Sequence, residues 1–191
     1  MDLSALYQKC GIDRLPLDPG QLARSLGCGL VTYEKFCRDT GTDLLTLLRS
    51  HNPDAFTHML SDGPVVVYNR QKPPGRRRWN VVHELSHVLL GELSEGAAEA
   101  RDLAADRLTA DLLAPLPVVS MCGVRTAREL QQLCGLSLEA AGLRWKELCA
   151  FRRGENGEWN DSDWALVRHF QPFISAVLDG FSPQSTTVPV Y

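Results

Sequence analysis

The pattern of apolar and polar positions predicts mostly helices and one clear strand. A helix is expected from Val81 to about Leu90, because Asn80 can cap its start and Gly91 can end it. Its apolar face recurs at helical spacing and consists of Val81, Val82, Leu85, Val88 and Leu89. The β-rich run Val65–Tyr68 follows Gly63-Pro64 and predicts the best strand in the chain.

Weaker patterns predict the remaining elements. Leu30–Tyr33 is expected to form a second strand, and Lys72–Gly75 to form a turn. Gly135 separates two helices, the second of which is capped by Ser137. The further helices are expected at residues 19–26, 42–49, 97–113, 126–134, 138–149 and 164–170.

Together these elements predict an α+β fold that is mainly helical and holds a small β-sheet. The length of 191 residues fits one domain of ordinary size with a helical annex. We expect a core at residues 1–117, a helical extension packed on it at residues 118–175, and a flexible tail at residues 176–191. The two helices that meet near Gly135 resemble a helix-turn-helix.

Charge and composition exclude several classes of protein. A net charge of −3 and a pI of about 5.9 exclude a globally basic nucleic-acid binder. No apolar run approaches the roughly 18 residues that span a bilayer. The N-terminus lacks the pattern of a signal peptide, so a cytoplasmic protein is expected. None of the six cysteines forms a Cys-x-x-Cys pair, which favours buried free thiols.

The residues that carry chemistry are His83-Glu84-Leu85-Ser86-His87. On a helix, positions i and i+4 share one face, so both imidazoles can reach one metal ion. Glu84 lies about 100° round the helix from His83, where it can act as a general base. The alternative is a pair of solvated histidines beside a surface charge. The pattern arises by chance in under ~1% of such chains, which favours a zinc site.

Zinc needs a third protein ligand. If the helix at 81–90 and the next helix form an antiparallel hairpin, the residue opposite the two histidines is Asp102. Glu99 and Asp106 lie on the same helix face and remain alternatives. A stripe of acidic residues on a solvated helix would show the same spacing.

Two segments resemble the ImmA/IrrE-type metallopeptidases. Arg78–Gly91 is similar to the active helix of that family, and Ala105–Pro115 is similar to its second motif. A later stretch, Glu129–Ala140, also fits. The resemblance implies a zincin-like fold and a zinc ion bound by His83 and His87. It implies a third ligand four residues before Asp106, which is Asp102, where the family has glutamate.

The resemblance also implies a function. It indicates a zinc-dependent endopeptidase in which Glu84 is the general base and the substrate is a partner transcriptional repressor with a helix-turn-helix. The shorter arm of Asp102 keeps an alternative open, namely a catalytically weak or inactive regulatory protein that binds a repressor or DNA. A purely structural zinc site would not need Glu84 beside the ligands.

Three further interpretations concern the rest of the chain. The strand Val65–Tyr68 is expected to hold substrate by strand addition, to be an ordinary core strand, or to be both. Arg144 and Lys146 would face DNA if the helix-turn-helix bound it, but the neighbouring glutamates argue against direct nucleic-acid binding. A group that stabilises the transition state stays unassigned among His169, Tyr68 and the arginines 76–78.

Overall fold

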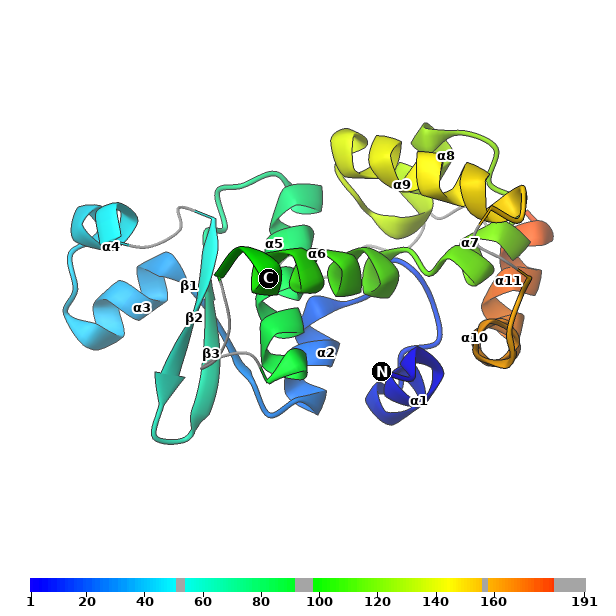
Figure 1. The fold of residues 1–191 in the computed structure, drawn as a ribbon. Helices are drawn as coiled ribbons and strands as arrows, with labels where there is room; N and C mark the ends of the chain where they lie inside the picture. The colour runs from blue at the N-terminus through cyan, green and yellow to red at the C-terminus, as the bar shows by residue number, and fades with distance from the viewer. Residues whose placement is uncertain (51–53, 92–97, 156–157, 181–191) are drawn as a thin grey trace. The chain divides into compact units, whose positions relative to one another are not determined.

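The computed structural model describes residues 1–50, 54–91, 98–155 and 158–180, which divide into two compact units (Figure 1). We call Pro19–Thr109 the sheet unit. Met1–Asp18 and the described residues from Ala110 to 180 form the helical unit. The boundary that the sequence suggests after residue 117 remains a prediction. Most of the expected tail at 176–191 lies outside the described residues.

The sheet unit contains a three-stranded mixed sheet in the order β1-β3-β2. Strand β1 (Gly29–Thr32) runs parallel to β3 (Gly63–Tyr68), and β2 (Ala55–Leu60) runs antiparallel to it. Because β3 is central, both of its edges are already paired. The strand predicted at Val65–Tyr68 is therefore a core strand, and the expectation that it holds substrate by strand addition is wrong.

Helices cover both faces of this sheet (Figure 1). On one face, α3 (Tyr33–Thr40) and α4 (Leu44–Ser50) enclose a cluster of buried side chains from Tyr33, Leu47, Phe56 and Val67. On the other face lie α2 (Pro19–Ser25) and α5 (Pro74–Leu90). The latter buries Val81, Val82 and Leu85, as its apolar periodicity predicts.

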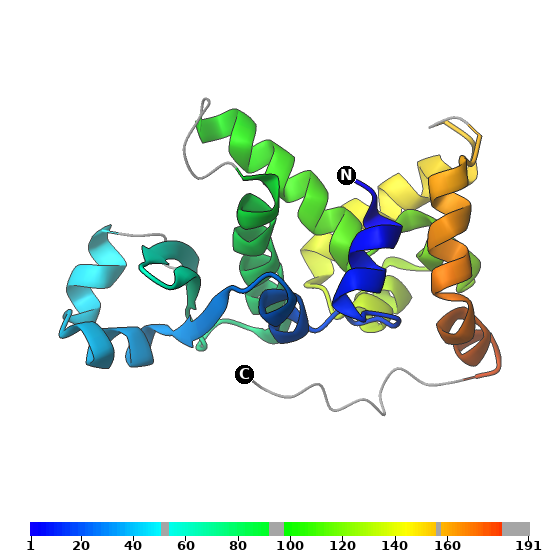
Figure 2. The same ribbon diagram turned by 90° about the horizontal axis from the view of Figure 1, so that it is seen from below.

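Helix α6 (Ala98–Leu113) crosses α5 within the sheet unit and continues into the helical unit. Figures 1 and 2 show that the two helices are steeply inclined to each other. Helices that cross at a steep angle touch over a short stretch rather than along their length. The few side chains at this crossing therefore decide which residues of α6 face α5.

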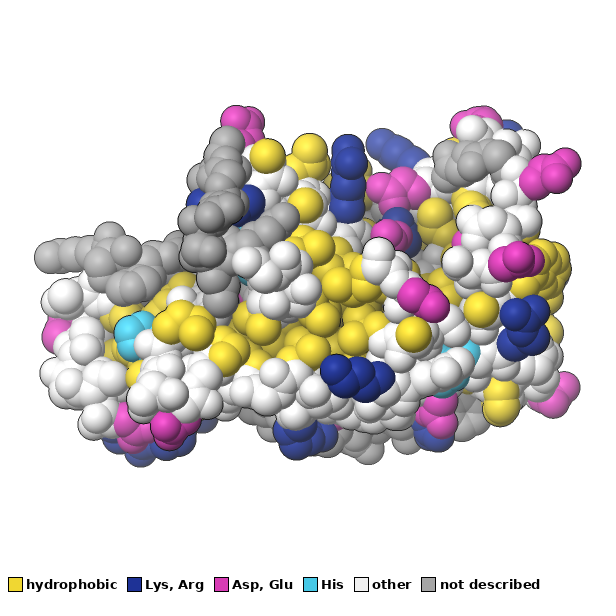
Figure 3. Space-filling model, turned by 60° about the horizontal axis from the view of Figure 1, so that its bottom comes forward, with side chains coloured by type: hydrophobic (Ala, Val, Ile, Leu, Met, Phe, Trp, Pro, Cys, Tyr) yellow, Lys and Arg dark blue, Asp and Glu magenta, His cyan; other side chains and the backbone are white. Residues whose placement is uncertain are grey.

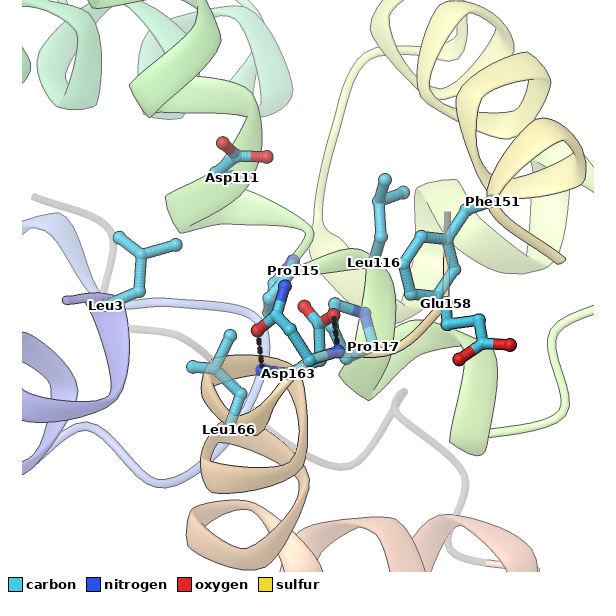
Figure 4. A pocket seen from close by; sticks show the side chains of 10 residues that line it. Leu3, Asp111, Pro115, Leu116, Pro117, Phe151, Glu158, Asp163 and Leu166 are labelled. Carbon is cyan, nitrogen blue, oxygen red and sulfur yellow. Dashed lines mark hydrogen bonds between the residues drawn. The ribbon is translucent and has the colours of Figure 1, made fainter. Parts of the chain in front are cut away.

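The helical unit is held together by contacts between its first and last segments. Its helices are α1 (Leu3–Cys10), α7 (Leu116–Met121), α8 (Ala127–Cys134), α9 (Leu138–Arg152), α10 (Asp161–His169) and α11 (Gln171–Leu178). The Tyr7 hydroxyl donates to the Leu112 carbonyl at 2.7 Å, and a ring nitrogen of His169 lies 2.7 Å from the Ile12 carbonyl oxygen. A pocket in this unit has an apolar wall and several carboxylates at its rim (Figure 4).

The structure confirms a mainly helical α+β fold with a small sheet. It also confirms Ser137 as the cap of α9 and Gly91 as the end of α5. Two expectations at the start of α5 are wrong, because the helix begins at Pro74 instead of Val81. The segment expected to turn at Lys72–Gly75 therefore supplies its first residues. Proline suits the first turn of a helix, where its missing N–H has no intrahelical partner.

Hydrophobic side chains also reach the surface, as the space-filling view in Figure 3 shows. In the sheet unit the large exposed ones are Leu44, Leu45, Met59, Leu60 and Leu103. None of the described helices is long and apolar enough to cross a membrane. All six cysteines are free, and four of them are buried, as their spacing predicts.

Candidate metal centre

Helix α5 brings the two histidines of the motif together. The Nε2 atoms of His83 and His87 lie 3.1 Å apart, and the two rings meet edge to face. Both side chains are mostly buried, with exposed fractions of 20% and 15%. Two imidazoles on successive turns of one helix thus point their Nε2 atoms at a single place.

Asp102 of α6 completes a set of three possible metal ligands. One of its carboxylate oxygens, Oδ1, lies 3.4 Å from His87 Nε2. One ligand atom from each of His83, His87 and Asp102 lies within 4.8 Å of the others. Among the described residues, neither Glu99 nor Asp106 belongs to such a group with the histidines. The roles of the three residues as ligands remain predictions, and the structure brings together the atoms that those roles require.

The donor set fits zinc. Zinc binds imidazole nitrogen at about 2.0–2.1 Å in tetrahedral sites, which places two ligand nitrogens about 3.3 Å apart. The observed separation of 3.1 Å between the Nε2 atoms is close to that value. Asp102 is the outlying member, because its side chain is 67% exposed and comes from a different helix.

Asp106 lies on the other side of the His83 ring, next to Nδ1 and not next to Nε2. Its Oδ1 atom lies 2.9 Å from His83 Nδ1, the ring nitrogen that faces away from His87. The two atoms are close, but the buried Nδ1 atom has no hydrogen-bond partner among the described residues. A carboxylate fixes the ring of a histidine ligand by accepting a hydrogen bond from its second nitrogen. Asp106 lies beside that nitrogen without making this bond.

Glu84 projects from α5 toward the sheet and meets strand β2. The hydroxyl of Thr57 donates a hydrogen bond of 2.7 Å to Glu84 Oε2. The pKa of the nearby Tyr33 is raised to about 12 by burial and by the charges of Asp54 and Glu84. Tyr33 is thus a neutral phenol at any ordinary pH and adds no negative charge near Glu84.

The sequence does not reveal Thr57 as part of the site. Residues 55–60 were not expected to form a strand, so nothing indicated that this threonine lies beside α5. The local signal is weak, because Ala55–Leu60 is short and its apolar and polar residues come in pairs instead of alternating.

Other sequence candidates have structural partners of their own. Arg76 donates to Asp54 at 2.7 Å, and Arg77 donates to the Arg70 carbonyl at 3.0 Å. Tyr68 is buried in β3. His169 lies in the helical unit and stacks on Tyr7.

Arg144, which the DNA-binding interpretation needs, is buried in the helical unit. It donates to the Ala114 carbonyl at 2.9 Å and to Asp111 and Glu147 at 2.6 Å. An arginine that is enclosed by these acceptors does not present its guanidinium to phosphates. This observation counts against the interpretation that α9 reads DNA.

The fold and the site define a class of protein. A mainly helical α+β fold carries a His-Glu-x-x-His helix beside a small mixed sheet, with a carboxylate from the next helix, and this is the arrangement of zincin-like metallopeptidases. Residues 37–146 match the family described as the IrrE N-terminal-like domain. The chain belongs to this family, which comprises metallopeptidases of the ImmA/IrrE type. No curated protein and no solved structure matches the chain.

Proposed function

We propose that the protein is a zinc-dependent endopeptidase that hydrolyses a peptide bond in a partner protein, a transcriptional repressor with a helix-turn-helix. The observation that carries the proposal is the convergence of two Nε2 atoms and one carboxylate within 4.8 Å, beside a glutamate on the same helix. Family membership supports the peptidase chemistry. The repressor as substrate follows from the family resemblance of the active helix.

In this proposal His83, His87 and Asp102 hold the metal ion. A zinc ion bound there would supply a Lewis acid that polarises the scissile carbonyl and lowers the pKa of water. Glu84 takes a proton from the attacking water as the water oxygen bonds to the carbonyl carbon. It then gives that proton to the leaving nitrogen when the C–N bond breaks. Thr57 holds the Glu84 carboxylate in place during both transfers.

Strand β2 is the sheet edge beside this chemistry. Its residue Thr57 bonds to Glu84, and no other strand in the described part of the chain pairs with its outer edge. An extended peptide that adds to this edge would gain main-chain hydrogen bonds. The substrate edge is therefore β2 in this proposal, in place of the central strand that the sequence suggested.

The test combines metal analysis with cleavage. Purified protein should contain about one zinc ion per chain, and a co-expressed helix-turn-helix repressor should be cut. Glu84→Gln should retain the metal but lose cleavage by at least about a hundredfold, because an amide cannot accept the proton. Protein without metal, or a Glu84→Gln variant that cleaves like wild type, would contradict the proposal.

One observation favours a second candidate, a catalytically weak regulatory protein that binds the repressor. The ligand atoms spread over up to 4.8 Å, wider than a closed tetrahedral set, and the outlying member is the short Asp102. This candidate predicts that the protein binds the repressor in a pull-down with purified components. It also predicts that the repressor stays intact when saturating zinc is added.

A further inference from the structure

Two buried hydroxyls join the helices that carry the candidate ligands. Ser86 of α5 and Thr109 of α6 are both fully buried, and their oxygen atoms lie 3.0 Å apart. Ser86 lies between the two histidines of the motif. Thr109 lies on the same face of α6 as Asp102 and Asp106, at positions i, i+4 and i+7.

The direction of this hydrogen bond follows from its second partner. The Ser86 hydroxyl lies 2.8 Å from the Val82 carbonyl, which can only accept. A serine has one hydroxyl proton, so Ser86 donates it to Val82 and must accept from Thr109. The bond between the helices is therefore directional, with Thr109 as the donor and Ser86 as the acceptor.

Apolar contacts alone would fix the position of α6 only loosely. Leu85 of α5 and Ala105 and Leu108 of α6 are buried, and the burial of apolar side chains has no preferred direction. The acidic residues of α6 are spaced about one turn apart, so a slide by one turn would bring Glu99 or Asp106 to the position opposite His87. That slide would also separate Thr109 from Ser86 and remove a buried hydrogen bond.

We propose that Ser86 and Thr109 are positioning residues that fix the register of α6 on α5, so that Asp102 is the carboxylate that faces His87. The inference rests on the proposed metal site and explains how the third ligand is selected among three acidic residues. Three contacts belong to this register. The Ser86–Thr109 contact is 3.0 Å, the His83–Asp106 contact 2.9 Å and the His87–Asp102 contact 3.4 Å.

The first measurement is zinc affinity by competition with a chelator. Thr109→Val keeps the shape of the side chain and removes the donor, and we expect it to weaken zinc binding about tenfold, as for other residues that support a ligand. Thr109→Ser keeps the hydroxyl and should stay within about twofold of wild type. Ser86→Ala should match Thr109→Val, and the double variant should be no weaker than either single variant, because both remove the same bond.

A matched control separates this role from general stability. Ser4 is a buried serine of α1 in the helical unit, and Ser4→Ala removes a hydroxyl of similar burial. It should lower the melting temperature without a change in zinc affinity. If Thr109→Val and Ser86→Ala also lower only the melting temperature, or if their effects on zinc affinity add, the register proposal is overturned.

A second measurement reports the register without metal. In the metal-free protein, a nuclear Overhauser contact should join the His87 ring to the β-protons of Asp102 in wild type and Thr109→Ser. It should weaken in Thr109→Val. An equal contact in all three variants contradicts the register proposal. Wild-type protein that shows this contact but binds neither zinc nor cobalt contradicts the proposed function and leaves the register supported.

Discussion

At the scale of single residues, the site depends most on the carboxylate that is least enclosed. The histidines are mostly buried, whereas the Asp102 side chain is 67% exposed. Asp102 also has one methylene fewer than the glutamate that the family has at this position. In the proposed site, its reach toward the histidines therefore sets how closely the three candidate ligands can gather round one ion.

Substitutions at Asp102 should distinguish the effect of side-chain length on zinc binding from the effect of the carboxylate charge. Asp102→Ala should weaken zinc binding by about a hundredfold or more, because it removes a ligand. Asp102→Glu should bind zinc at least as well as wild type, since the longer arm spans the gap. Glu99→Ala is the control, because Glu99 is exposed on the same helix and lies outside the ligand group. Chelator competition measures all three, and a loss in Glu99→Ala would reassign the third ligand.

Thr57 offers a second prediction at this scale. Thr57→Val removes the hydroxyl that donates to Glu84 and should lower kcat about tenfold, near the low end expected for a hydrogen bond to a charged group. KM and zinc content should stay the same, because a peptide on β2 would bond to its main chain and Thr57 is not one of the proposed ligands. Thr57→Ser should restore kcat. Equal rates for the valine and serine variants would show that the hydroxyl does not position Glu84.

At the scale of elements, caps in the sequence predicted some helix ends correctly. Ser137 and Gly91 are examples, because each satisfies backbone groups that a helix leaves open, whereas Asn80, expected to cap α5, lies inside it. Prolines stand at helix boundaries in two places. The turn expected at Lys72–Gly75 is wrong because α5 begins at Pro74. The helix expected at 97–113 does end at Leu113, and only the start of α7 at Leu116 was not predicted. A proline can follow the end of one helix or stand at the start of the next, and the local sequence does not distinguish these two cases.

The start of α5 is fixed by an ion-pair cluster that local patterns could not show. Asp54, just before β2, is 10% exposed and lies 2.6 Å from Lys72 Nζ and 2.7 Å from Arg76 Nε. Burial raises the pKa of Asp54, but the hydrogen bonds and charges of Lys72 and Arg76 outweigh it and hold the pKa below its usual value of 3.8. The cluster ties the sheet to the helix that carries the histidines.

This cluster gives a pH-dependent prediction. Asp54→Asn should lower the melting temperature at pH 7 by about 4–8 °C, corresponding to about 2 kcal/mol. Because the folded-state pKa of Asp54 is lowered, its contribution is present above the unfolded pKa and is lost as the pH falls through the folded pKa. Wild type and variant should therefore converge below about pH 4. Asp62→Asn, an exposed change in the same hairpin, should show no such convergence.

At the scale of the whole molecule, the sequence predicted the fold class and the motif but not how distant segments associate. Nothing local in Met1–Asp18 shows that Tyr7 bonds to Leu112 or that Ile12 meets His169. The closeness of the candidate ligand atoms was more predictable than the association of distant segments, because spacing on two helices fixes most of that geometry. Only Asp102 needed an assumption about packing, and Thr57 needed a strand that was not foreseen.

Metal binding should also be visible in the stability of the whole protein. Zinc at a hundred times its Kd should stabilise the folded state by about 2.7 kcal/mol, which corresponds to a rise in Tm of about 5–11 °C. Glu84→Gln should keep this shift because it leaves the ligands intact. His83→Ala should lose it. A thermal scan with and without zinc measures the effect, and a full shift in His83→Ala would place the metal elsewhere.

The unequal exposure of the three proposed ligands has a consequence for the rate at which metal would enter and leave. An ion arriving from solvent would meet the exposed Asp102 before the more buried imidazoles, and a departing ion would leave on that side. A chelator would therefore compete for the ion at Asp102 first. Exchange of the metal should then be fast for a site with two buried ligands, and the availability of zinc around the protein would govern how many molecules hold it.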